Sequence, residues 1–167
     1  MDPRAVELIS QLRLQAHPEG GWYREIFRSQ ARVQAEGKRA SRNAITAIYF
    51  LLESGRHSRW HKVQSDEVWI HLEGAPLDLW QWDASANVSS CTTLGSMNFH
   101  TDVHYQHVVP AGIWQAARPK RKPSADFTLV SCVVGPGFDF ADFEMMDKSS
   151  PEATLIGRDW PELAYLI

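Results

Sequence analysis

One short stretch constrains the fold of this chain more than any other. In DEVWIHLE, residues 66–73, two chemically different sets of side chains alternate: Glu67, Trp69 and His71, and between them Val68, Ile70 and Leu72. Successive side chains of a β-strand point to opposite faces, so this strand has a polar-aromatic face and an apolar face. Neither face suits open water. The pattern therefore predicts a barrel, with one face lining the interior and the other packed on a second sheet or another subunit.

Other short segments along the chain also have strand character. NAITAIYFLL, LDLWQWD and FTLVSCVV are β-branched, aromatic or alternating runs, separated by Gly, Pro, Asp and Ser. Many short strands with frequent turns are typical of an antiparallel sandwich or barrel. We expect the barrel to span about residues 20–135.

The two ends of the chain have helical signals instead. Asp2 is suited to cap a helix and Pro3 to its first position, which predicts a helix over about residues 3–15. Near the other end, SSPEATLI again places a serine cap before a proline, which predicts a short helical segment over about 139–165. The 167 residues fit a single domain, 1–167.

Charge and cysteine content exclude some classes of partner. The formal net charge of −3 gives no attraction for a polyanion, so nucleic acid is not an expected partner. No apolar run reaches the ~18 residues that span a bilayer, and the first residues are too charged for a signal peptide. Cys91 and Cys132 show no paired spacing, which favours free thiols. We expect a soluble, cytoplasmic protein that does not bind membranes.

Several charged or polar features are predicted to be structural. We interpret the basic run Arg118–Pro123 as a solvated loop, because two prolines interrupt it. Four histidines are assigned to surface or loop positions: His57, His100, His104 and His107. In GGWYREIFRS the alternation places Tyr23, Glu25 and Phe27 on one face of a packing strand. Arg24 and Arg28 share the other face. In an alternative interpretation, one of these two arginines binds an anionic group of a ligand.

Two groups of residues resemble the motifs of the cupin superfamily. Gly55, His61, Glu67 and Gly74 have the spacing of the first motif, although Val63 stands where its second histidine would be. Pro110 and Gly112 match the second motif, in which Gln115 replaces the histidine. The blocks HPEGGWYREIFRS, TAIYFLLESG, WHKVQSDEVWIHLEGAPL and VPAGIWQAA resemble a small single-cupin family of unknown function over about residues 5–145. The resemblance implies an RmlC-like jelly-roll barrel (a double-stranded β-helix), often paired as a homodimer.

The resemblance also indicates where a site would lie. It implies that His61 and Glu67 point into the lumen beside Gln115, and we take His61 and Glu67 as candidate catalytic residues. The candidate ligand-binding residues are His61, Glu67, Trp69, His71, Gln115 and Tyr49. Metal-binding cupins that resemble germins use three histidines and the glutamate, and only His61 and Glu67 of that set are present, so no metal is predicted. If a metal does bind, His61, Glu67 and Gln115 are the expected ligands, with His57 or His71 as substitutes.

The sequence leaves several functions open. One is a metal-independent isomerase or epimerase acting on a sugar or nucleotide-like substrate, with His61 as base and Tyr49 or Tyr105 as acid. A second is a module that binds or senses a small molecule without changing it. A third is a metal-dependent oxygenase or isomerase. A structural or storage role is disfavoured, since buried polar groups cost free energy unless they are partnered or used. Whether the protein catalyses a reaction is left open.

Overall fold

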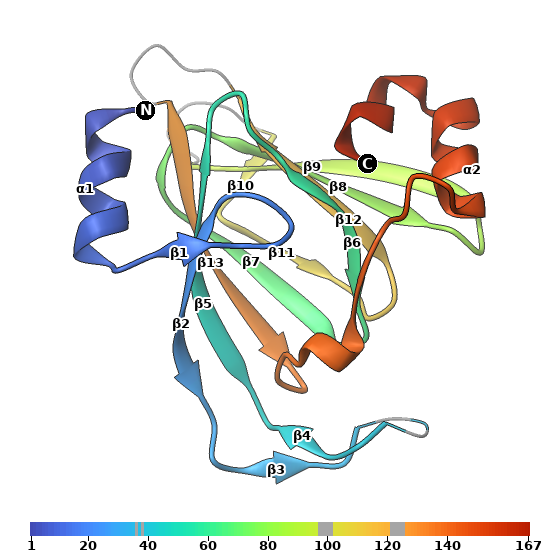
Figure 1. Ribbon diagram of the computed structural model, residues 1–167, viewed down its shortest axis with the longest axis horizontal. Coiled ribbons are helices and arrows are strands. Elements are labelled where there is room, and N and C mark those ends of the chain that lie inside the picture. Colours follow the sequence, from blue (N-terminus) through green and yellow to red (C-terminus); the bar gives the residue numbers. More distant parts are fainter. Residues whose placement is uncertain (36, 38, 97–101, 121–125) are drawn as a thin grey trace.

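Two β-sheets face each other and enclose the interior of a barrel (Figure 1). The computed structural model describes residues 1–35, 37, 39–96, 102–120 and 126–167. The first sheet consists, in spatial order, of β1 (Gln15–Ala16), β2 (Trp22–Arg28), β5 (Thr46–Glu53), β13 (Phe127–Gly135), β7 (Asp66–Gly74) and β11 (Gln106–Val109). The second consists of β10 (Val103–His104), β9 (Val88–Leu94), β8 (Leu77–Asp83), β12 (Trp114–Pro119), β6 (Ser58–Val63) and β14 (Phe143–Met145). This arrangement confirms the predicted mainly β, jelly-roll fold.

A short ribbon and a helix flank the first sheet. The strands β3 (Arg32–Val33) and β4 (Arg42–Asn43) pair with each other and lie at one end of the molecule (Figure 1). The helix α1 (Pro3–Gln11) begins as predicted, because the Asp2 carboxylate accepts a hydrogen bond from the backbone N–H of Arg4. It ends earlier than predicted: Arg13 adopts a positive φ of 53°, and the next residues form β1. Its buried residues pack on the outer side of the first sheet.

The C-terminal segment is only partly helical, which corrects the prediction for 139–165. After a short 3-10 turn, η1 (Phe140–Asp142), residues 143–145 form β14 and pair with β6. The helix α2 (Pro151–Asp159) then begins at the predicted cap, since Ser150 Oγ accepts from the N–H of Ala153. A second 3-10 segment, η2 (Pro161–Leu166), follows.

Tryptophans gather where these C-terminal helices cover the second sheet. Ile156, Leu163 and Leu166 pack there against an aromatic cluster: Trp60, Trp80, Trp82, Trp114 and Trp160. Trp114 therefore faces out of the barrel, as its position next to Gln115 in a strand requires. The C-terminal helices thus remove the large aromatic surface of this face from water.

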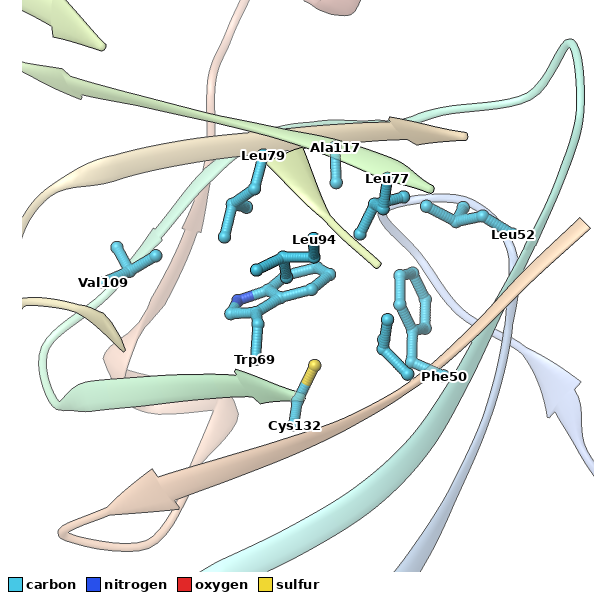
Figure 2. Packing of buried hydrophobic residues seen from close by; sticks show 10 residues of the cluster. Phe50, Leu52, Trp69, Leu77, Leu79, Leu94, Val109, Ala117 and Cys132 are labelled. Atoms are coloured by element: carbon cyan, nitrogen blue, oxygen red, sulfur yellow. The ribbon is translucent and has the colours of Figure 1, made fainter. Parts of the chain in front are cut away.

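The opposite face of the same sheet contributes to the barrel interior. Figure 2 shows the Trp69 ring surrounded by apolar side chains from both sheets, among them Phe50, Leu79 and Leu94. Trp69 and Glu67 are buried, whereas Leu72 on the other face of β7 is 46% exposed. The alternation in β7 is confirmed.

A β-bulge changes which side chains of β2 point inward. Its register against β5 shifts between Glu25 and Phe27, and one extra residue reverses the alternation after that point. Tyr23 and Glu25 face the interior, but Arg28 joins them and Phe27 is 53% exposed. The predicted grouping of Phe27 with Tyr23 and Glu25 is therefore wrong.

Other surface assignments need smaller corrections. Arg118 and Pro119 are the last residues of β12 and not part of a loop, whereas 121–123 lie outside the described residues, as does His100. His57 and His107 are half-buried, and His107 Nε2 lies 2.5 Å from Gln81 Nε2. Both cysteines are free thiols. Within the described residues, no helix is long and apolar enough to cross a membrane.

The C-terminal helices form part of the hydrophobic core. The side chain of Ile156 is fully buried against the tryptophan cluster. We expect Ile156→Ala to lower the free energy of unfolding by about 2–5 kcal/mol, measured by urea denaturation. Thr154→Ala, at an exposed position of the same helix, is the control. Equal effects of the two substitutions would contradict this account.

Candidate functional site

A cavity of about 500 Å³ lies between the sheets beside the Trp69 core. Phe50 and Cys132 belong to both the core and the cavity wall. The polar lining comes from the strands β1, β2, β5, β6 and β7 and from three residues outside the strands. It consists of Gln15, His17, Glu19, Tyr23, Glu25, Arg28, Thr46, His61, Glu67 and Asp139. The apolar lining includes three phenylalanines whose rings contact one another edge to face: Phe138, Phe140 and Phe143.

A buried carboxyl–imidazole pair is the central feature of this wall. Glu19 Oε2 lies 3.1 Å from His61 Nε2. The other carboxyl oxygen, Oε1, accepts a hydrogen bond from Ser58 Oγ at 3.0 Å. Glu19 is 6% exposed and His61 is 1% exposed. Water therefore cannot replace these bonds, and the pair must satisfy its own hydrogen-bonding requirements.

The neighbouring groups determine where the proton of this pair resides. His61 Nδ1 faces the carbonyl oxygen of Arg59 at 2.8 Å, and a carbonyl only accepts, so Nδ1 carries a hydrogen. Burial raises the pKa of Glu19 to about 8 and lowers the pKa of His61. At neutral pH Glu19 is therefore a carboxylic acid that donates its O–H to Nε2 of a neutral imidazole. One proton is shared between the two residues.

Backbone contacts bring Glu19 to His61 from outside the strands. Gly20 has a φ of +110°, and a Cβ there would lie only 2.5 Å from the carbonyl oxygen of His57. Glycine thus allows the segment to pack directly on the turn between β5 and β6. The carbonyl of Glu19 then accepts from the N–H of Arg59 at 2.9 Å. The same residue, Arg59, accepts from His61 through its own carbonyl.

A second buried carboxyl, Glu67, is oriented by a chain of donors. Trp69 Nε1 donates to Gln115 Oε1 at 2.9 Å, and Gln115 Nε2 donates to Glu67 Oε2 at 2.6 Å. Because an indole N–H can only donate, the amide oxygen of Gln115 must face Trp69 and its NH₂ must face Glu67. Burial raises the pKa of Glu67, while the Gln115 hydrogen bond acts in the opposite direction.

His17 packs as a neutral ring beside the pair. Its Nδ1 accepts from the backbone N–H of Glu19 at 3.3 Å, and its ring meets Tyr23 edge to face at 4.5 Å between centroids. Burial lowers the pKa of His17 to about 4. His17 therefore carries no charge at neutral pH and forms part of an aromatic wall.

Arg28, the arginine of the lining, is fully occupied by protein groups. Its Nε and Nη2 donate to the Glu25 carboxylate, and its Nη1 donates to Asn43 Oδ1 and to the carbonyl of Phe138. The Glu25 carboxylate compensates its charge at 2.7 Å. The other ionisable groups of the lining are carboxyls or neutral imidazoles. The cavity therefore offers no spare positive charge to an anionic ligand.

Comparison with known proteins identifies the family. A family model described as Cupin superfamily (DUF985) matches residues 6–146. The chain belongs to this family. An uncharacterized protein of Saccharomyces cerevisiae, YML079W, is 28% identical over 173 residues, covering 96% of this chain and 84% of the yeast protein.

Solved structures resemble this DUF985 cupin along nearly its whole length. A hypothetical protein from Leishmania major has a TM-score of 0.81 at 30% identity, covering 98% of this chain and 96% of that one. Protein SO0799 from Shewanella oneidensis has a TM-score of 0.77 at 28% identity, covering 96% and 92%. Oxalate decarboxylase of Lactobacillus farciminis, at 14% identity and a TM-score of 0.55, covers 92% of this chain and 41% of its own, a likeness that shows the fold alone.

The structure brings together some of the residues predicted from the sequence of this DUF985 cupin. His61 and Glu67 line the cavity, with Gln115 and Trp69 behind Glu67. His71 lies beyond Trp69 along β7, outside the lining, and its Nε2 is 3.1 Å from the carbonyl oxygen of Ala75. A ligand-contact role for these five residues stays a prediction.

The tyrosines proposed as acid partners lie elsewhere. Tyr49 points away from the cavity, because its neighbours in β5, Ile48 and Phe50, both line it. Tyr105 is 50% exposed. Tyr23, which the sequence analysis placed only in a packing strand, is the tyrosine of the lining within the described residues.

Glu19 and His17 were not among the site residues predicted from the sequence. Both belong to HPEGGWYREIFRS, which was used only for the family resemblance and for the strand that it contains. A usable signal was present, since an acid placed between a proline and two glycines marks a segment whose backbone is set for close packing. What the sequence does not show is that this segment closes over the turn before His61.

The residues of this site do not fit the metal set that the resemblance implies. Val63 has no donor atom, and the amide oxygen of Gln115 is already bound by Trp69. His61 Nε2, the nitrogen available to a metal, is directed at Glu19. Among the described residues, no group of three His, Cys, Asp or Glu side chains is arranged to hold a metal ion.

The raised pKa of Glu19 predicts a pH dependence of stability. The carboxyl has a pKa near 4.5 when unfolded and about 8 when folded, so its stabilising contribution is complete below pH 4.5 and is lost as the pH rises to about 8. His61 has a lowered pKa in the folded protein, and its titration in the unfolded state is common to the wild type and Glu19→Gln, so it cancels in their comparison. We expect the unfolding free energy of the wild type to fall relative to Glu19→Gln between pH 6.5 and 8, measured by urea denaturation. A constant difference across this range would contradict the assignment of the shared proton.

Proposed function

We propose that this protein catalyses a metal-independent proton transfer next to a carbonyl group, as in an isomerase or epimerase. The observation that carries the proposal is the buried Glu19–His61 pair, which shares one proton and faces the cavity together with Glu67. Two carboxyls in one site with different surroundings are suited to act as acid and base. Both have pKa values raised toward neutrality, where general acids and bases work best.

The roles follow from the hydrogen bonds. Glu67, which accepts from Gln115, takes the proton from the carbon next to the carbonyl, and the electrons of that C–H bond form the C=C bond of an enol. Until the transfer, the neutral His61 accepts the O–H of Glu19 and keeps this acid in position. Glu19 then gives its proton to the carbonyl oxygen, and Ser58 Oγ, which donates to Oε1, stabilises the resulting carboxylate. Glu67 then returns its proton to the neighbouring carbon, which was the carbonyl carbon, while the hydroxyl on the carbon that was deprotonated gives its proton to Glu19 and becomes the new carbonyl. The isomer is formed and both carboxyls regain their starting protonation.

The charge of the lining supports an uncharged substrate. Arg28 is already paired with Glu25, so a phosphate or carboxylate entering the cavity would lose its hydration without gaining a cationic partner. The phenylalanine rings favour a ligand with an apolar face, such as the C–H face of a sugar ring. We therefore narrow the sugar or nucleotide-like class to uncharged sugars and similar hydroxycarbonyl compounds.

The experiment follows hydrogen exchange, which does not require the product to be known. Uncharged aldoses, ketoses and simple hydroxyketones are incubated with the protein in D₂O, and loss of the α-proton signal is followed by NMR. We expect exchange with the wild type and a decrease of about 100-fold or more in Glu67→Gln and in His61→Asn. His104→Asn, at an exposed position outside the cavity lining, serves as the matched control and should keep the wild-type rate.

Each alternative function gives a different result in this assay. Saturable binding without exchange would replace catalysis by a binding or sensing role for the same cavity. Exchange that disappears with a chelator, together with stoichiometric Fe, Mn, Ni or Zn in protein prepared without a His tag, would replace the proposal by metal-dependent chemistry.

We also propose that the protein forms a homodimer through the outer face of the first sheet, in line with the family resemblance. Apolar side chains are exposed there on the adjacent strands β7 and β11, Leu72 at 46% and Val108 at 47%, and on β2, which two strands separate from β7, Phe27 at 53%. Val68 and Ile70 lie between Leu72 and Val108 and are half-buried. An apolar face of this kind matches a second copy of itself under two-fold symmetry.

The dimer proposal is tested by charge insertion. We expect Leu72→Asp and Val108→Asp to convert a dimer into a monomer, because each would bury an unpaired carboxylate. Light scattering after size exclusion measures the mass. Val88→Asp, at a 58% exposed position of the other sheet, is the control and should leave the dimer intact. A wild-type protein that is monomeric at all concentrations would overturn the proposal.

A further inference from the structure

A second candidate binding site lies on the outside of the barrel, at the end where β5 turns into β6. A hollow there is lined by Gly55, His57, Arg118, Pro119, Lys120 and Tyr165. Its wall carries three basic side chains and no carboxylate among the described residues. A neighbouring hollow shares Gly55 and His57 and adds Arg56 and Arg59. The basic surface formed by Arg56, His57, Arg59, Arg118 and Lys120 is called the basic hollow below.

The charges of the basic hollow are largely uncompensated. Within the described residues, none of Arg56, Arg59 and Arg118 forms an ion pair with a carboxylate. Lys120 is neutralised by Asp78 at 3.1 Å. The carboxyls of the neighbouring hollow are Glu53, which accepts from Trp22 Nε1, and Glu19, which is protonated. In a chain of net charge −3, three free guanidinium groups around one histidine form a local excess of positive charge.

Aromatic rings fix the position of Arg118. Its guanidinium carbon lies 5.4 Å from the centre of the Trp80 ring and 5.2 Å from that of Tyr165. Tyr165 in turn contacts the His57 ring edge to face at 5.7 Å. An arginine held by rings loses little rotational freedom when it binds a ligand, and its donor edges remain available.

His57 experiences the surrounding charge directly. Burial is the main reason that its pKa is lowered, and the charges of Arg59, Arg118 and Arg56 lower it further. Arginines from two different strands and from the turn between β5 and β6 thus act on one ring. An anion bound among these arginines would offset their effect and raise the pKa of His57 again.

We propose that the basic hollow binds the phosphoryl group of a small phosphate monoester or of inorganic phosphate. Three guanidinium groups match the charge of a dianion better than that of a single carboxylate, and their planar donors suit phosphate oxygens. The hollow lies outside the cavity and the proposal does not depend on the proposed reaction. Phosphate would thus bind on the outer surface, whereas the substrate proposed for the cavity is uncharged.

Binding is tested on the full-length protein by NMR titration with inorganic phosphate and with ribose 5-phosphate. We expect saturable shifts of the side-chain signals of His57, Arg59 and Arg118. The dissociation constant should rise about tenfold or more in Arg59→Gln and in Arg118→Gln, since each removes a charge-assisted hydrogen bond. Arg118→Lys retains the charge without the planar donors and should give an intermediate value. It also remains informative if Arg118→Gln disturbs the ring packing.

Two controls make the result specific. Arg32→Gln removes the same charge from β3, at the opposite end of the molecule in Figure 1, and should leave the affinity unchanged. Uncharged ribose should cause no shift at His57. The proposal is overturned if phosphate shifts these signals without saturation, if the glutamine variants bind as tightly as the wild type, or if only a long polyanion such as an oligonucleotide binds.

Discussion

The site of this protein depends on a single proton held between Glu19 and His61 in a place that water hardly reaches. If both groups were charged, the pair would pay for the desolvation of two ions, and with no proton at all a bare carboxylate would face a lone pair. The shared proton avoids both costs. It also adds no net charge to the cavity, where Arg28 and Glu25 neutralise each other and His17 is uncharged.

The strand pattern of the sequence was enough to predict the barrel and part of its interior. The period of two in β7 placed Glu67 and Trp69 inside, and motif spacing placed His61 beside them. The same period, applied to β5, assigns Tyr49 to the outer face, because Ile48 and Phe50 flank it. The same rule therefore already argued against Tyr49 as a residue of the lumen.

Two other features could not be predicted from the alternation of side chains along the strands. Arg28 faces the cavity only because a bulge adds one residue to β2, and WYREIFRS contains no glycine or proline to announce it. Glu19 reaches His61 from a segment that belongs to no strand, so its position follows from packing between parts of the chain about forty residues apart. Long-range packing of irregular segments leaves no periodic trace in a sequence.

The route by which Glu19 and His61 are held has a further consequence. Both are anchored through the main chain of Arg59, whose N–H binds the Glu19 carbonyl and whose C=O binds His61 Nδ1. Main-chain groups are common to nearly all amino acids. Evolution is thus free to change the side chain at position 59 while the inner pair stays in register, and proline, which lacks the N–H, is the one residue type that breaks this tie.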